Sequence, residues 1–175
     1  MNRTLRLGLL AIMPAFTAAC GSDDESDSTD MTPGPAMQQA SAETQSVLAL
    51  TAGYRNWSKF AENPTLKPSP THNNMQVISY YNDVVGQAIA AKTLPLPNGA
   101  LIVKENWAAA TDAGPMALTI MHKQGADWYW SQVTPDGKVF LDGMGVPLEG
   151  KSVPMCVNCH QTNVNDGLRT HDFSM

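Results

Sequence analysis

Two cysteines and a histidine near the end of the chain have the types and the spacing that could do chemistry. The run reads Cys156-Val157-Asn158-Cys159-His160, and C-x-x-C-H is the attachment pattern of c-type haem. Each thiol adds to one haem vinyl group, and two intervening residues allow both sulfurs to reach their vinyls from one helical turn. The spacing therefore predicts one covalent haem c, held by Cys156 and Cys159, with the adjacent His160 as ligand of the haem iron.

Paired cysteines also serve in redox centres and in zinc sites. A redox C-x-x-C usually belongs to the start of a βαβ unit, whereas this pair lies near the C-terminus. A structural zinc site needs four ligands, and outside the motif only His72, His122 and His171 could complete the set. We expect His72 and His122 to be structural and His171 to lie in a frayed tail, and haem attachment is the interpretation that uses the whole motif.

The N-terminal residues are typical of an export signal. Arg3 and Arg6 precede a short apolar run, Leu7 to Phe16, that is too short to span a bilayer. Small residues follow, and then Cys20. This order resembles a bacterial lipobox, which predicts that residues 1–19 are a signal peptide and that the Cys20 thiol is acylated. The alternative is an ordinary signal peptide followed by a chance cysteine.

The segment after the signal has the composition of a solvated tether. Residues 20–40 are rich in Ser, Asp, Thr, Pro and Gly and show no apolar period, so they cannot bury enough surface to fold. The predicted organisation is a signal peptide at 1–19, a tether at 20–40 and a haem domain at 41–175. Export and lipidation would hold that domain on the periplasmic side of a bacterial membrane, where haem is attached to thiols.

The charge of the chain excludes one class of partner. The formal net charge is −5, and five acidic residues lie between positions 23 and 30. Lys and Arg form no cluster along the sequence, and phosphate binding requires such a cluster. We therefore expect no binding to nucleic acid.

Hydrophobic periodicity predicts a domain of two helices and four or five strands. Apolar residues at helical spacing over 41–60 indicate an amphipathic helix with Ser41 as its N-cap. The other predicted elements are a proline-rich loop at 63–70, a strand at 75–81, a helix capped by Asn82 that ends at 91, a strand at 100–107, a hairpin of strands 117–123 and 127–133, and a strand at 138–141. Together they predict an α+β fold: a mostly antiparallel β-sheet with flanking helices, and the haem attached near the C-terminus.

These features, in this order, resemble those of the cytochrome P-460 family, which includes the cytochromes c′-beta. The resemblance covers roughly residues 50–165. The matching positions are Trp57, His72, Tyr81-Asn82, Pro97-Asn98-Gly99-Ala100-Leu101-Ile102-Val103-Lys104-Glu105, Met121-His122-Lys123, Asp127-Trp128-Tyr129-Trp130 and the C-x-x-C-H motif. The resemblance implies a homodimer and a five-coordinate iron, with His160 on one side and an open position on the other.

The resemblance also implies a function and a role for Lys104. In the cross-linked members of the family a lysine is bonded to a haem meso carbon, and Lys104 is the matching residue. Those members oxidise hydroxylamine, while the cytochromes c′-beta lack the cross-link and bind nitric oxide. We therefore expect a monohaem cytochrome acting on small nitrogen species, with hydroxylamine oxidation as its enzymatic form. Nitric oxide binding without turnover and plain electron transfer to an unidentified redox partner are the alternatives.

Strand alternation gives an independent view of Lys104. In a strand over 100–107, Lys104 shares a face with Ile102 and Asn106, while Glu105 faces the other way. On an apolar face the pKa of Lys104 would be lowered, which would leave a neutral amine able to react. The alternative is a surface lysine paired with a carboxylate. Hydroxylamine oxidation also needs a base near the iron, and no glutamate here matches the one that the cross-linked members use.

Four further side chains have simpler interpretations. Trp128 and Trp130 share one strand face, and we expect core packing rather than a redox relay. Met144 is the candidate sixth iron ligand of an electron carrier. Met155 adjoins Cys156 on the same side as His160, which disfavours it as a ligand on the opposite face.

Overall fold

The computed structural model describes residues 35–162 and 165–173 of the chain. The predicted signal peptide at 1–19, the predicted lipidation residue Cys20 and the tether as far as residue 34 lie outside these ranges. Within them, no helix is both long enough and apolar enough to cross a membrane.

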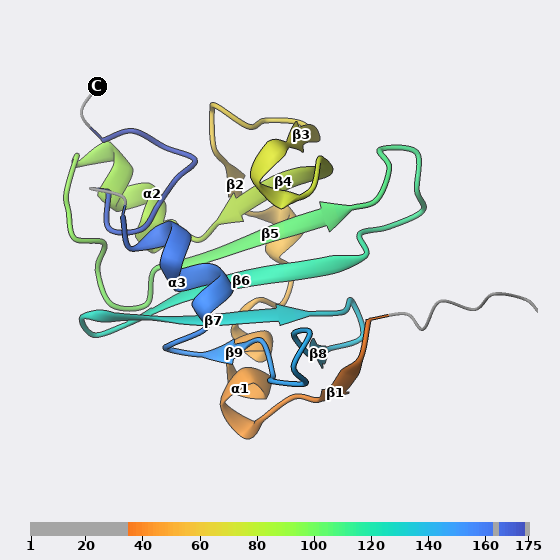
Figure 1. The fold of residues 1–175 in the computed structure, drawn as a ribbon. Helices are drawn as coiled ribbons and strands as arrows, with labels where there is room; N and C mark the ends of the chain where they lie inside the picture. The colour runs from red at the N-terminus through yellow and green to blue at the C-terminus, as the bar shows by residue number, and fades with distance from the viewer. Residues whose placement is uncertain (1–34, 163–164, 174–175) are drawn as a thin grey trace, which may run out of the picture. The chain divides into compact units, whose positions relative to one another are not determined.

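Among the described residues, nine strands form one sheet in which every pairing is antiparallel. The hydrogen-bonded order is β1-β8-β7-β6-β5-β4-β2, with β3 paired to β4 and β9 paired to β7. The strands are β1 Met37–Gln39, β2 Ser58–Lys59, β3 Lys67–Ser69, β4 Met75–Tyr81, β5 Leu101–Trp107, β6 Ala117–Gln124, β7 Asp127–Val133, β8 Lys138–Phe140 and β9 Glu149–Gly150. The helices are α1 Ala42–Leu50, α2 Asp83–Ala90 and α3 Pro154–His160, with 3₁₀ turns at Tyr54–Asn56 and Pro70–His72. This arrangement confirms the predicted α+β fold class (Figure 1).

The sheet carries one apolar cluster on each face, because successive side chains of a strand point to opposite sides. Ile102, Met121 and Trp130 belong to the cluster that α2 and α3 cover. Leu101 and Val103 belong to the other cluster, which α1 covers. The motif helix α3 therefore lies on the face of the sheet to which Ile102 points, in front of β6 and β7 in Figure 1.

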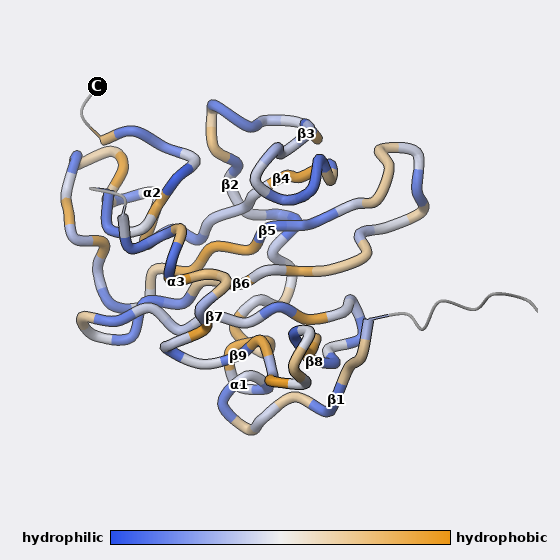
Figure 2. The backbone as a smooth tube through the Cα atoms, in the orientation of Figure 1, coloured by the Kyte–Doolittle hydropathy of each residue, from blue (hydrophilic) through white to orange (hydrophobic). Residues whose placement is uncertain are grey.

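The central elements agree closely with the predicted ones. β4 has the predicted bounds, and β5, β6 and β7 each differ from prediction by at most one residue. The Asn82 cap of α2 is confirmed, because its Oδ1 accepts from the Val85 N–H at 3.3 Å. The same oxygen accepts from the Leu101 N–H at 3.2 Å, so one side chain fixes α2 to the start of β5. Along β5 the hydropathy then changes from apolar to polar (Figure 2).

The predicted helix over 41–60 is wrong in its second half. Ser41 does cap α1, since its side chain accepts from the Thr44 N–H, but the helix ends at Leu50. Gly53 then adopts a left-handed conformation with φ 73°, which an α-helix does not permit. The residues that follow form a 3₁₀ turn and β2. Their aromatic side chains still reach the core under α1, which explains why the apolar spacing continued past the helix end.

The predicted tether is too long at its C-terminal end. Met37–Gln39 form β1, which pairs with β8, and Ala40 is 4 % exposed. All three side chains of β1 are exposed. Such a strand is held by main-chain hydrogen bonds and carries no apolar pattern, so composition alone could not separate it from the tether.

Glu105 is buried on the face of the sheet that α1 covers, opposite Lys104. Its carboxylate accepts from the Tyr54 hydroxyl at 2.6 Å, from Arg55 Nε at 2.6 Å and from Trp107 Nε1 at 2.9 Å. Burial raises the pKa of Tyr54, and the hydrogen bond to Glu105 and the negative charge of that carboxylate raise it further. This carboxylate ties the 3₁₀ turn at 54–56 to β5 and is not available as a base on the α3 face, as strand alternation predicts.

Candidate haem site

The motif cysteines lie on one short helix that packs against the sheet. α3 begins with Pro154, whose missing N–H suits the first turn of a helix. Cys156 and Cys159 are three residues apart and therefore lie on the same side of α3. Both thiols are free and partly buried, and Cys156 contacts the apolar cluster beneath the helix. Desolvation raises the pKa of Cys156 to about 11, so this thiol is protonated at neutral pH before any covalent chemistry.

His160 is held in one tautomer. Its Nδ1 lies 2.6 Å from the Gly167 carbonyl oxygen, and because a carbonyl can only accept, Nδ1 carries the proton and Nε2 keeps its lone pair. Burial lowers the pKa of His160 even though the Gly167 bond opposes this shift. Its ring lies 4.7 Å from that of Trp130, centroid to centroid. A neutral imidazole with a carbonyl on Nδ1 and a free Nε2 is the arrangement found in metal-bound histidines.

A cavity of about 830 Å³ opens beside α3. Val157 and His160 of the helix line it, together with Trp128 and Trp130 of β7. Most of its other walls come from two loops, around Leu94–Pro95 and around Asp166–Gly167, and from the β6–β7 turn. The cavity is large enough for a ligand of cofactor size. His160 is one of its walls, whereas Cys156, Cys159 and Lys104 are not among the residues that line it.

Among the described residues, the partner of the Lys104 amine is a histidine and not a carboxylate. Its Nζ lies 2.6 Å from His72 Nε2, and His72 Nδ1 lies 2.7 Å from Ser69 Oγ. Burial lowers the pKa of Lys104 to about 8, although negative charge at Cys156 and Cys159 would act in the opposite direction. The structure therefore favours the partly buried amine on the α3 face over the surface lysine. Sequence reasoning missed the contact with His72, although it marked both residues.

We expect the His72 imidazole to stay neutral down to about pH 4, because burial and then the charge of Lys104 disfavour its protonated form. Its ordinary pKa is 6.5, so between these values the unfolded chain binds the proton and the folded state does not. Stability should then fall as the pH drops from 6.5 to about 4, and His72→Gln should reduce this loss. NMR titration of ¹³C-labelled histidine measures the pKa, and a midpoint near 6.5 in the folded protein would contradict this packing.

The remaining histidines lie apart from the motif. His171 Nδ1 lies 2.7 Å from Glu62 Oε1. His122, on β6, is partly buried, and desolvation lowers its pKa. In the part of the chain that the structure describes, no group of three or more His, Cys, Asp or Glu side chains could hold a metal ion. The described residues therefore do not assemble the four ligands of the zinc alternative.

The other predicted candidates lie in ordinary environments. Met144 and Met155 are 86 % and 66 % exposed, so neither side chain is packed in the cluster under α3. Trp128 and Trp130 are core residues of that cluster, as predicted. Asp166, which sequence reasoning did not mark, is a wall of the cavity.

Comparison of this chain with protein-family models, with curated proteins and with solved structures found no match.

Proposed function

We propose that this chain is a monohaem c-type cytochrome with an open iron position that acts on small nitrogen species. One observation carries the proposal. Two free thiols on one side of α3 precede an imidazole whose Nδ1 proton is committed to the Gly167 carbonyl. This leaves Nε2 as the only coordinating atom of His160. Thioether attachment at Cys156 and Cys159 with iron ligation by His160 uses each of these groups.

The surroundings of α3 fit such a cofactor. Apolar side chains on this face of the sheet would contact a porphyrin, and the cavity beside the helix has His160 in its wall. When bound, the haem would supply a redox-active iron with a coordination position for a small ligand. The chain would fix the attachment points, orient the imidazole and exclude water by apolar packing.

The Lys104–His72 pair supports chemistry on a substrate that must lose protons, such as hydroxylamine. Proton removal is most effective when the pKa of the base lies near the operating pH, and Lys104 has a pKa of about 8. Lys104 Nζ lies 2.6 Å from His72 Nε2, and because the pKa of His72 is lowered to about 4, the imidazole stays neutral and orients the amine as a hydrogen-bond acceptor. If Lys104 is not bonded to the haem, its amine would take the place of the glutamate that the resemblance leaves without a match. Binding of nitric oxide without turnover would leave the pair without a proton to remove.

Export, acylation of Cys20 and assembly as a homodimer belong to the same proposal and rest on the sequence and on its resemblance to the cytochrome P-460 family.

The absorption spectrum of the haem-loaded protein tests the proposal. A strongly red-shifted ferrous band is expected if Lys104 is bonded to the haem. A high-spin spectrum without that shift would favour nitric oxide binding, and a low-spin spectrum would favour electron transfer and contradict an open iron position.

If Lys104 is bonded to the haem, replacing it by Met should restore the ordinary ferrous spectrum of haem c, because the variant has no amine to form the bond. Lys138→Met is the matched control, since Lys138 is an exposed lysine on β8 that pairs with Asp136, and its spectrum should equal that of the wild type. A Lys104→Met spectrum identical to the wild type would rule the cross-link out.

A further inference from the structure

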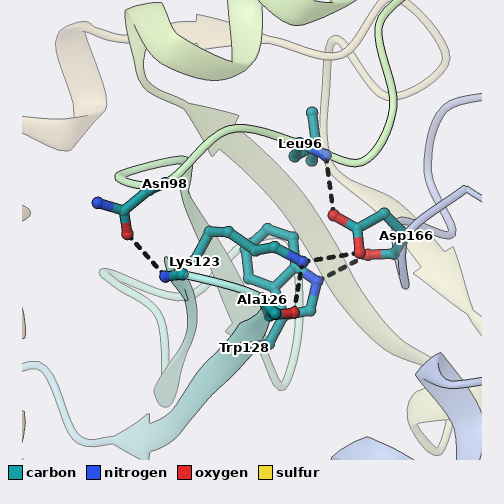
Figure 3. A network of polar contacts seen from close by, with 7 residues as sticks. Leu96, Asn98, Lys123, Ala126, Trp128 and Asp166 are labelled. Carbon is teal, nitrogen blue, oxygen red and sulfur yellow. Dashed lines mark hydrogen bonds and ion pairs between the residues drawn. The ribbon is translucent and has the colours of Figure 1, made fainter.

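Lys123 is a buried lysine whose partners all lie next to the motif helix. Its side chain is 2 % exposed, and its Nζ donates to Asp166 Oδ1 at 2.8 Å and to the Ala126 carbonyl at 3.0 Å. The ammonium also lies 5.1 Å from the centroid of the Trp128 ring. Figure 3 shows the Lys123 ammonium bonded to both the Ala126 carbonyl and the Asp166 carboxylate. A lysine this deeply buried needs such partners, because burial of an unpaired charge is costly.

Asp166 is held from three directions. Its Oδ1 accepts from Lys123 of β6, and its Oδ2 accepts from the Leu96 N–H at 2.9 Å. Its main-chain carbonyl accepts from Trp128 Nε1 of β7 at 2.7 Å (Figure 3). Side chain and backbone are therefore both fixed, so the position of the next peptide group is set by the sheet.

The next residue, Gly167, is the one that bonds His160. Asp166 and Gly167 both adopt left-handed conformations, with φ of 52° and 82°. That pair of turns aims the Gly167 carbonyl at His160 Nδ1, 2.6 Å away. A side chain at 167 would be strained by this φ and would contact Trp128 and His160. The left-handed conformations of Asp166 and Gly167 thus place the Gly167 carbonyl at His160 Nδ1.

We infer that the buried Lys123–Asp166 ion pair is a positioning device that holds the Gly167 carbonyl on His160 Nδ1 and thereby sets the iron-binding strength of Nε2. The inference rests on the proposed function in that it takes His160 as the iron ligand. A strong hydrogen bond at Nδ1 raises the basicity of the imidazole and favours ferric over ferrous iron. Lys123 and Asp166 then act on the iron only through His160.

Stability alone does not account for the pair. A buried ion pair is often no more stable than well-packed apolar residues of the same volume, whereas removal of one partner is strongly destabilising. The pair also fixes the position of Asp166, and through it the position of the Gly167 carbonyl that bonds the His160 imidazole.

Two variants that weaken the device by different routes test the inference. Asp166→Asn removes the charge but keeps a residue type that tolerates the left-handed conformation. Trp128→Phe removes the indole N–H that donates to the Asp166 carbonyl and keeps an aromatic ring in the core cluster. Glu105→Gln is the control, because it removes the charge of a buried carboxylate that pairs with the exposed Arg55 on the opposite face of the sheet. The readouts are the iron–histidine stretching frequency of the ferrous protein and the midpoint potential of the haem.

Both test variants are expected to lower the stretching frequency and raise the potential, while Glu105→Gln lowers stability and leaves both values unchanged. The inference would be overturned if the two test variants lose stability as the control does but keep the iron–histidine stretching frequency and the midpoint potential of the wild type. Wild-type protein without covalent haem would instead refute the proposed function. In that case the ¹⁵N chemical shifts of His160 in the haem-free protein test the inference. A single Nδ1–H tautomer in the wild type that becomes a mixture of tautomers in Asp166→Asn supports the positioning role of the ion pair. Tautomer populations that do not change in the variant overturn it.

Discussion

Changing both Cys156 and Cys159 to Ala is expected to abolish covalent haem, so that any remaining haem is released under denaturing conditions. The reason is that these thiols are the only described cysteines and lie on one side of α3. Each single variant should retain one thioether and hold part of its haem. A haem stain of a denaturing gel, with the protein matured in a host competent for haem attachment, measures the result.

The third cysteine of the chain provides the control for this experiment. Cys20 lies far outside the motif, so Cys20→Ser should keep the full haem content while losing the predicted acylation. Haem that stays attached to the Cys156→Ala/Cys159→Ala protein would refute the attachment residues.

Replacing Glu105 by Ala is expected to lower the free energy of unfolding by about 2–4 kcal/mol. The carboxylate is 1 % exposed and accepts from Tyr54, Arg55 and Trp107. Truncation leaves a cavity and removes the acceptor of two partly buried aromatic donors, whereas Arg55, with 57 % of its side chain exposed, can turn to water. Urea unfolding of wild type and variant measures the difference.

Glu105→Gln separates the charge from the shape in this prediction. The amide keeps one acceptor oxygen and nearly the same volume, so its cost should be smaller than that of Ala. A change below about 0.5 kcal/mol for Glu105→Ala, the range of ordinary surface substitutions, would contradict the role given to this carboxylate.

The fold was predictable where a local pattern decides the structure. β4 to β7 have alternating or continuously apolar side chains, and α2 has its Asn82 cap in the sequence. β1, β2, β3 and β9 are two or three residues long and are held by main-chain bonds to longer strands. Their side chains carry no signal, so the prediction gave a tether, a helix end and loops in their place.

The candidate site, like the fold, was predictable where a local pattern is enough and not where long-range contacts decide. Cys156, Cys159 and His160 were found because the chemistry fixes their spacing along five residues. Lys104 was marked by strand alternation, but its contact with His72 depends on pairing across 32 positions. The Lys123–Asp166 pair spans 43 positions, and nothing in either local segment indicates that the two residues meet.

Intact mass spectrometry of the purified wild-type protein under denaturing conditions is the decisive test of haem attachment. We expect one species with the mass of the mature polypeptide plus one haem, and a peptide map that assigns the added mass to the segment holding Cys156 and Cys159. A colourless protein with the mass of the polypeptide alone, made in a host that attaches haem to other cytochromes, would contradict it.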